Sequence, residues 1–209
     1  MARRPQSSPR KTASQKRSRF TVDALLDATT RILVKEGFDR ASTNKIAATA
    51  GVSVGSLYQY FPSKEALVAA VVERHAQELS RVTHAALLEV ASLPLAVGVR
   101  RIVEAAIDAH RMDPVLHRVL AEEVPRTRWF ENVDLIERNA RALVRVYLEA
   151  HRDETDVADL DLAAFVLVTT VEALTHSAVL GNPEIVAGKK AEKFVAEVTR
   201  LVLGYLSSA

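Results

Sequence analysis

The sequence predicts an all-α protein of about nine helices. From residue 21 onward, apolar residues recur at helical spacing, and no stretch alternates apolar and polar residues as a half-buried strand does. Pro, Gly and short polar segments separate the helical stretches. A chain of 209 residues has room for a small domain joined to a larger one, and it can bury a sizeable core.

The composition excludes several classes of chemistry and divides the chain by charge. With no cysteine, disulfides, zinc–thiolate sites and thiol nucleophiles are excluded. The net charge of +2 conceals an asymmetry, because residues 1–64 hold 12 Lys and Arg against 4 Asp and Glu, whereas residues 65–209 hold 16 against 22. The basic part suits a polyanion, and the acidic remainder would be repelled by one.

Residues 1–19 are predicted to form a disordered basic arm. They hold seven Lys and Arg and no acid, with mostly Ser, Pro and Gln between them. Such an arm can lie along phosphates or enter a minor groove, and Arg17 and Arg19 lie nearest the first predicted helix. No apolar segment follows the basic residues, so we expect no secretory signal.

The first three helices are expected to form one compact domain. Residues 21–36 are amphipathic, with Thr21 as a possible cap and Gly37 as the stop. In residues 42–61, Ser42 or Thr43 can cap a short helix that ends at Gly51. Ser53 can then cap a second helix. Two short helices around a glycine turn are the pattern of a helix-turn-helix.

Residues 21–72 closely resemble the DNA-binding domain of the TetR family of bacterial transcriptional regulators. The resemblance is carried by one long run in a single register: Thr43, Ile46, Ala47, Ala50, Gly51, Val52, Ser53, Gly55, Leu57, Tyr58, Tyr60, Phe61, Ser63, Lys64, Glu65 and Leu67. It implies a DNA-binding domain at 20–66 and a helical ligand-binding and dimerisation domain at 67–209. We therefore expect a cytoplasmic protein, nucleoid-associated when bound to DNA.

DNA recognition requires phosphate contacts for position and base-edge contacts for sequence. Gln59 can pair with adenine, Val54 can touch a thymine methyl, and Gly55 permits close backbone approach. The rings of Tyr58 and Tyr60 could instead pack between helices. The predicted DNA-binding set is Arg17, Arg19, Thr43, Lys45, Ser53, Val54, Gly55, Ser56, Tyr58, Gln59, Tyr60 and Lys64.

Two patterns suggest other chemistry and are rejected. Residues 51–55 match the G-x-S-x-G nucleophile elbow, but that motif requires a strand before the serine, and a helix is predicted there. His110, Asp113 and His117 lie close in sequence, but Pro114 interrupts the helix between them, and no H-E-x-x-H spacing occurs. We expect no enzyme activity, no metal and no cofactor.

The remaining helices are predicted at 63–90, 95–111, 114–123, 129–151, 160–180 and 191–206. Residues 162–180 have nearly the length and apolar character of a membrane span. Glu172 and His176 lie inside this stretch, together with four hydroxyl side chains, so a central helix of a bundle or an oligomer interface explains it better.

A ligand pocket is expected beside the helix at 160–180, where four polar or aromatic residues share one stripe. The predicted lining is His110, Trp129, Phe130, Tyr147, Phe165, Thr169, Glu172 and His176. An equally weighted alternative is that Glu172 and His176 pair with each other or with arginines across an interface.

The resemblance also implies a homodimer in which the last two helices of each subunit form a four-helix interface. The residues expected there are Leu162, Val166, Ala173, Leu174, Phe194, Val198, Leu201, Val202 and Tyr205. It implies a ligand-responsive regulator, most simply a repressor, that binds a near-palindromic double-stranded DNA operator and is released by a small-molecule effector. The alternative is an architectural DNA binder without an effector.

Overall fold

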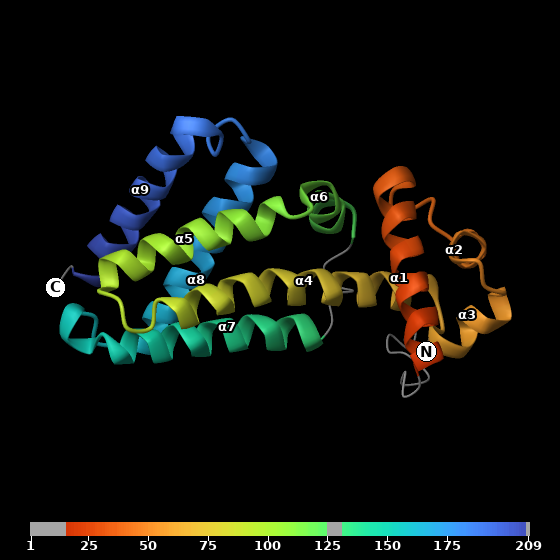
Figure 1. Cartoon of the computed structure of the whole chain (residues 1–209), viewed down its shortest axis with the longest axis horizontal. Coiled ribbons are helices and arrows are strands. Elements are labelled where there is room, and N and C mark those ends of the chain that lie inside the picture. The colour runs from red at the N-terminus through yellow and green to blue at the C-terminus, as the bar shows by residue number, and fades with distance from the viewer. Residues whose placement is uncertain (1–15, 125–130, 208–209) are drawn as a thin grey trace, which may run out of the picture. The chain divides into compact units, whose positions relative to one another are not determined.

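The computed structural model describes residues 16–124 and 131–207. In these residues the chain forms nine α-helices and no strand, so the predicted all-α class is confirmed (Figure 1). Their bounds are α1 (Lys16–Glu36), α2 (Thr43–Ala50), α3 (Val54–Tyr60), α4 (Lys64–Glu89), α5 (Leu95–Arg111), α6 (Pro114–Glu123), α7 (Glu131–Ala150), α8 (Leu160–His176) and α9 (Gly188–Leu206).

Helix α1 begins at Lys16, so the prediction of a start at Thr21 and of disorder up to residue 19 was wrong for residues 16–19. The basic residues at 16–19 form helix readily, and the hydroxyl of Ser18 donates a hydrogen bond to the Tyr60 hydroxyl at 3.1 Å. A contact with α3, far along the sequence, thus helps to extend the helix.

The chain divides into two compact units. The N-terminal unit comprises residues 1–75 and 115–133, and the C-terminal unit comprises residues 76–114 and 134–209. The expected domain boundary at residue 66 lies inside α4, which contributes residues to both units. Helix α6 groups with the N-terminal unit, although the sequence suggested that it belongs with the later helices.

The core of the N-terminal unit is made by the apolar faces of α1 to α4. Its fully buried side chains include Leu25, Leu33, Ile46, Leu57, Phe61, Leu67 and Val71. Gly37 ends α1 at φ +81°, a conformation that L residues rarely adopt. Beside it, the carboxylate of Glu123 at the end of α6 accepts a hydrogen bond from the Phe38 amide at 3.0 Å.

The C-terminal unit is built around α5, α8 and α9, which pack against one another, with α7 beside the second half of α4 (Figure 1). Two apolar clusters form its core. One includes Val90, Val99, Leu148, Leu167 and Leu206, and the other joins Val103 and Ile107 to Val195 and Val198.

The segment Leu160–Gly181, α8 and the π-helical turn after it, is long and apolar enough to cross a membrane by length and composition. In the C-terminal unit it contributes Ala163, Ala164 and Leu167 to the core. The carboxylate of its Glu172 lies 3.2 Å from Nε2 of the buried His110 of α5. These contacts place one side of the segment in the core of the C-terminal unit.

Candidate nucleic-acid interface and C-terminal cavity

Helices α2 and α3 adopt the predicted helix-turn-helix arrangement. Ser42 caps α2 by accepting a hydrogen bond from the Lys45 amide at 3.3 Å. At the other end, Gly51 is left-handed at φ +69°, and the amide of Val52 donates to the Ala47 carbonyl at 3.0 Å. This glycine turn directs the chain into α3.

Ser53 is a helix cap, as the sequence predicted. Its hydroxyl oxygen accepts a hydrogen bond from the Ser56 amide at 3.1 Å, and the two hydroxyls lie 2.8 Å apart. Helix α2 precedes this serine, so the strand that a nucleophile elbow needs is absent from this position.

The opening of α3 presents small and uncharged groups to solvent. Ser53, Gly55, Tyr58 and Gln59 are exposed, whereas Leu57 of the same helix is completely buried. The half-buried members of the predicted set are Thr43, Val54, Ser56, Tyr60 and Lys64, and the exposed Lys45 and Arg19 complete the described side chains. The side chain of Arg17 lies outside the described residues.

Two hydroxyl contacts fix the tyrosines of α3. The hydroxyls of Tyr58 and Thr43 lie 3.1 Å apart and join α3 to α2, while Tyr60 accepts from Ser18 of α1. Tyr58 remains 41% exposed. Both rings therefore pack between helices and also remain partly exposed to solvent, which is typical of amphipathic aromatic residues.

The two lysines of the predicted set have partners within the unit. Lys45 donates to Glu36 at 2.5 Å, and this hydrogen bond lowers the pKa of the Glu36 carboxyl. Lys64 donates to the Phe38 carbonyl at 3.0 Å and lies 4.3 Å from the centre of the Phe38 ring. Sequence spacing gave no sign of either contact, because both connect separate elements.

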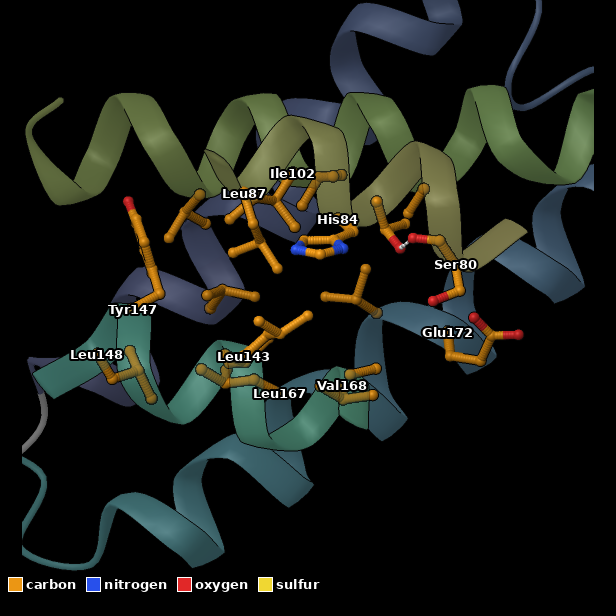
Figure 2. A pocket seen from close by; sticks show the side chains of 18 of the residues that line it. Ser80, His84, Leu87, Ile102, Leu143, Tyr147, Leu148, Leu167, Val168 and Glu172 are labelled. Atoms are coloured by element: carbon orange, nitrogen blue, oxygen red, sulfur yellow. Dashed lines mark hydrogen bonds between the residues drawn. The ribbon is translucent and has the colours of Figure 1, made fainter. Parts of the chain in front are cut away.

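A cavity of about 140 Å³ lies within the C-terminal unit, between α4, α5, α7, α8 and α9 (Figure 2). Most of its lining is aliphatic. The lining residues are Ser80, Thr83, His84, Leu87, Val99, Ile102, Val103, Ala106, Ala140, Leu143, Val144, Tyr147, Leu148, Leu167, Val168, Val171, Glu172, Val202 and Leu206.

The polar groups of the lining are few and unevenly placed. Figure 2 shows Ser80 and Glu172 at one end, Tyr147 and Leu148 at the other, and His84 between them. The hydroxyl of Thr83 is used within α4, where it donates to the carbonyls of Leu79 and Ser80. Within the part of the chain that the structure describes, the buried Tyr147 hydroxyl has no hydrogen-bond partner, and burial is the main cause that raises its pKa.

His110 of α5 contacts the Glu172 carboxylate. The imidazole is 2% exposed, with Nδ1 2.7 Å from the Ala106 carbonyl oxygen and Nε2 3.2 Å from Glu172 Oε1. Burial of the ring disfavours its charged form, but the hydrogen bond and the charge of Glu172 outweigh burial and raise the pKa of His110.

Only part of the predicted pocket set meets at the cavity. Tyr147 and Glu172 line it, and His110 reaches it through Glu172. Phe165 and Thr169 are exposed on α8 and are not in the lining; His176 packs against His110, with ring centroids 6.0 Å apart. Trp129 and Phe130 lie outside the described residues.

Sequence reasoning missed the wall that α4 and α5 provide. Ser80, Thr83, His84 and Leu87 are spaced by three or four residues and so share one side of α4. None of these four residues belonged to the predicted pocket set.

The residues expected at a dimer interface divide between surface and core. Leu162 and Leu201 are 55% and 52% exposed, and Ala173 is also exposed. Val166, Leu174, Phe194 and Tyr205 are half-buried. Val198 and Val202 are each 4% exposed and lie in the core of the C-terminal unit, where Val202 also lines the cavity.

Comparison with known proteins identifies the family. Residues 94–206, more than half of the chain, match the model of the tetracyclin repressor-like C-terminal domain, and residues 25–71 match that of the bacterial regulatory proteins of the tetR family. The chain belongs to the TetR family. It is therefore a DNA-binding transcriptional regulator and not an enzyme.

Among curated proteins, this TetR-family chain is similar to the nucleoid occlusion factor SlmA of Haemophilus ducreyi, with 35% identity over 101 residues, which are 48% of each chain. The chain thus spans about half the length of that relative.

Among solved structures, it resembles a TetR family transcription regulator from Marinobacter aquaeolei VT8 (18% identity, TM-score 0.67, covering 93% of this chain and 99% of the other). It also resembles the fatty acid degradation regulator FadR from Bacillus halodurans (20% identity, TM-score 0.69, covering 89% and 96%). At these identities the likeness concerns the fold alone.

Proposed function

We propose that this TetR-family regulator is a cytoplasmic, ligand-responsive repressor. It binds a near-palindromic operator as a homodimer and leaves the DNA when a small molecule occupies the cavity of the C-terminal unit. The observation that carries the proposal is the cavity itself, which a DNA binder without an effector would not need.

The DNA-binding half of the proposal rests on α3. Its exposed Gln59 offers a long amide for a base edge, while Tyr58 and Tyr60 offer hydroxyls near the rim of the helix. Two such helices in a dimer would enter the major groove about one turn apart, roughly 34 Å. The exposed Leu162 and Leu201 supply apolar surface for the partner subunit.

Release by the effector is a shift between two populations. The small molecule must bind more tightly to the state that does not fit the operator, and the ratio of the two affinities sets how far the equilibrium can move. Effector binding and operator binding should therefore weaken each other by the same factor.

The test is a gel shift on the DNA flanking the gene of this protein. Gln59→Ala should change the preferred operator sequence, whereas Tyr60→Ala should weaken specific and random DNA alike. The neighbouring exposed Asn44→Ala, outside the predicted contact set, serves as the matched control. Absence of any specific complex on flanking DNA would reject the regulator model, and a stable monomer in sedimentation would reject the dimer.

A second candidate is an effector-independent, nucleoid-associated DNA binder. It is favoured by the similarity to proteins named nucleoid occlusion factors. The two candidates differ in one measurement, because only the ligand-responsive repressor has a small molecule that both stabilises the protein and releases operator DNA.

A further inference from the structure

We propose that the cavity of the C-terminal unit takes small lipophilic cations, with the apolar body among its aliphatic residues and the cationic nitrogen at the Glu172 carboxylate. This inference rests on the proposed function, since it names the ligand class for that site. Three properties of the lining carry it: its size, its charge and the position of its polar end.

The cavity is small and its lining is mostly apolar. Leu87, Val99, Ile102, Leu143 and Val171 are among its aliphatic walls, so the enclosed part offers a ligand dispersion contacts and little hydrogen bonding. Its volume of about 140 Å³ is close to that of an engineered protein cavity of about 150 Å³ that holds benzene. The ligand body that fits without rearrangement is one ring or a branched alkyl group.

The charge of the lining favours a positively charged ligand. Among the residues that line the cavity, Glu172 is the single acidic residue, and no Lys or Arg is present. A ligand with a carboxylate would lose water from that group next to the Glu172 carboxylate. No lysine or arginine of the lining could compensate for the lost water. An ammonium group instead exchanges hydration for a charge-assisted contact.

The position of Glu172 makes such a contact feasible. Its side chain is 58% exposed at one end of the lining, opposite Tyr147 in Figure 2. A ligand can thus bury its body toward Leu143 and Leu148 while its charged nitrogen stays partly hydrated. His110 approaches Oε1 from α5 and orients the carboxylate, which as an ion has about four lone-pair positions in total.

The experiment compares three probes that share a phenyl ring: benzylamine as the cation, benzyl alcohol as the neutral molecule and benzoate as the anion. Calorimetric titration of the full chain at neutral pH should give benzylamine up to about fivefold tighter binding than benzyl alcohol, since about fivefold is the upper limit for a partly exposed ion pair. Benzoate should bind weakest. Equal affinities, tighter binding of benzoate, or no binding of benzylamine at millimolar concentration would overturn the proposal.

Glu172→Gln removes the charge and keeps an acceptor for His110. It should reduce benzylamine to the affinity of benzyl alcohol and leave benzyl alcohol unchanged. Asp161→Asn is the matched control, because Asp161 is an exposed acid of α8 that pairs with Arg145 outside the cavity lining. A cation preference that survives Glu172→Gln refutes the assignment, as does one that Asp161→Asn removes.

Val168→Phe locates the binding site, since the larger ring fills the cavity from α8. It should weaken benzylamine and benzyl alcohol together, and wild-type binding in this variant would overturn the proposal. Melting temperature and near-ultraviolet circular dichroism establish that each variant is folded. Benzylamine that binds in calorimetry but leaves the operator complex intact would reject release by this ligand, not the ligand class.

Discussion

Lys64 is joined to Phe38 twice, through a hydrogen bond from Nζ to the carbonyl oxygen at 3.0 Å and through a cation–π contact with the ring at 4.3 Å. Both contacts hold the loop between α1 and α2 against the start of α4. A residue of the predicted DNA-binding set thus also stabilises the N-terminal unit.

Lys64→Gln should lower the free energy of unfolding by about 1–2 kcal/mol, because it removes a charged donor and the cation above the ring. Urea denaturation measures the change. Lys45→Gln is the control, since its ion pair with Glu36 is exposed and should contribute little to stability. Wild-type stability of Lys64→Gln would mean that these contacts contribute nothing in solution.

Two glycines of the helix-turn-helix should respond in opposite directions to alanine. Gly51→Ala forces a side chain into a left-handed residue at φ +69° and should destabilise the protein by roughly 1 kcal/mol. Gly55 lies inside α3 with ordinary space around it, so Gly55→Ala should stabilise by about 0.5–1 kcal/mol. Thermal denaturation of both variants tests the pair, and the same sign for both would contradict the assigned conformations.

The buried hydroxyl of Tyr147 is a site where removing an atom should help. It has no hydrogen-bond partner among residues 16–124 and 131–207, so Tyr147→Phe should raise stability by about 1 kcal/mol. Denaturation of the variant against wild type measures the gain, and a loss of stability would mean that the hydroxyl has a partner in solution.

The same hydroxyl lies against Gly98, where an added Cβ would overlap it. Gly98→Ala should cost about 1–3 kcal/mol through overpacking. Tyr147→Phe should restore part of that loss, because the ring carbon Cζ would still lie 3.0 Å from the new Cβ. A double-mutant cycle measures the coupling. Strictly additive effects would show that the two sites do not meet.

The pairing of His110 with Glu172 should make stability depend on pH. Both imidazole nitrogens face acceptor oxygens, so only the doubly protonated ring satisfies both. Because the folded pKa is raised, the stabilisation is complete below the unfolded value of about 6.5 and is lost as pH rises through the folded pKa.

Glu172→Gln isolates this effect. The stability difference between wild type and variant should be larger at about pH 6 than at about pH 8.5, by a few tenths of a kcal/mol, since Glu172 is partly exposed and screened. Urea denaturation at the two pH values measures it. A difference that is constant or grows with pH would contradict the pairing.

The sequence predicted best what depends on neighbours along the chain. Ser42, Gly51 and Ser53 determine the ends of two helices through local hydrogen bonds and one backbone conformation, and the structure confirms each. The partners of Lys45 and Lys64 were not predictable, because they lie across loops whose path no local pattern specifies.

The cavity was only partly predictable for a related reason. Helical spacing places Phe165, Thr169 and Glu172 on one side of α8, but the rotation of the helix in its bundle decides which side faces the cavity. That side carries Leu167, Val168 and Val171, and Glu172 lies at its border. Val198 and Val202 illustrate the same ambiguity, because an apolar repeat at helical spacing is compatible with a core as well as with an interface, and the structure places both residues in the core.

Helix α6 makes the N-terminal unit discontinuous along the chain. Its His117 lies 2.8 Å from His75 of α4, nitrogen to nitrogen, and its Glu123 accepts from the Phe38 amide. A chimera cut at residue 66 would therefore transplant the helix-turn-helix without part of its own support. Exchange of operator specificity between relatives, in the laboratory or in evolution, should succeed more often when α6 is transferred together with the helix-turn-helix.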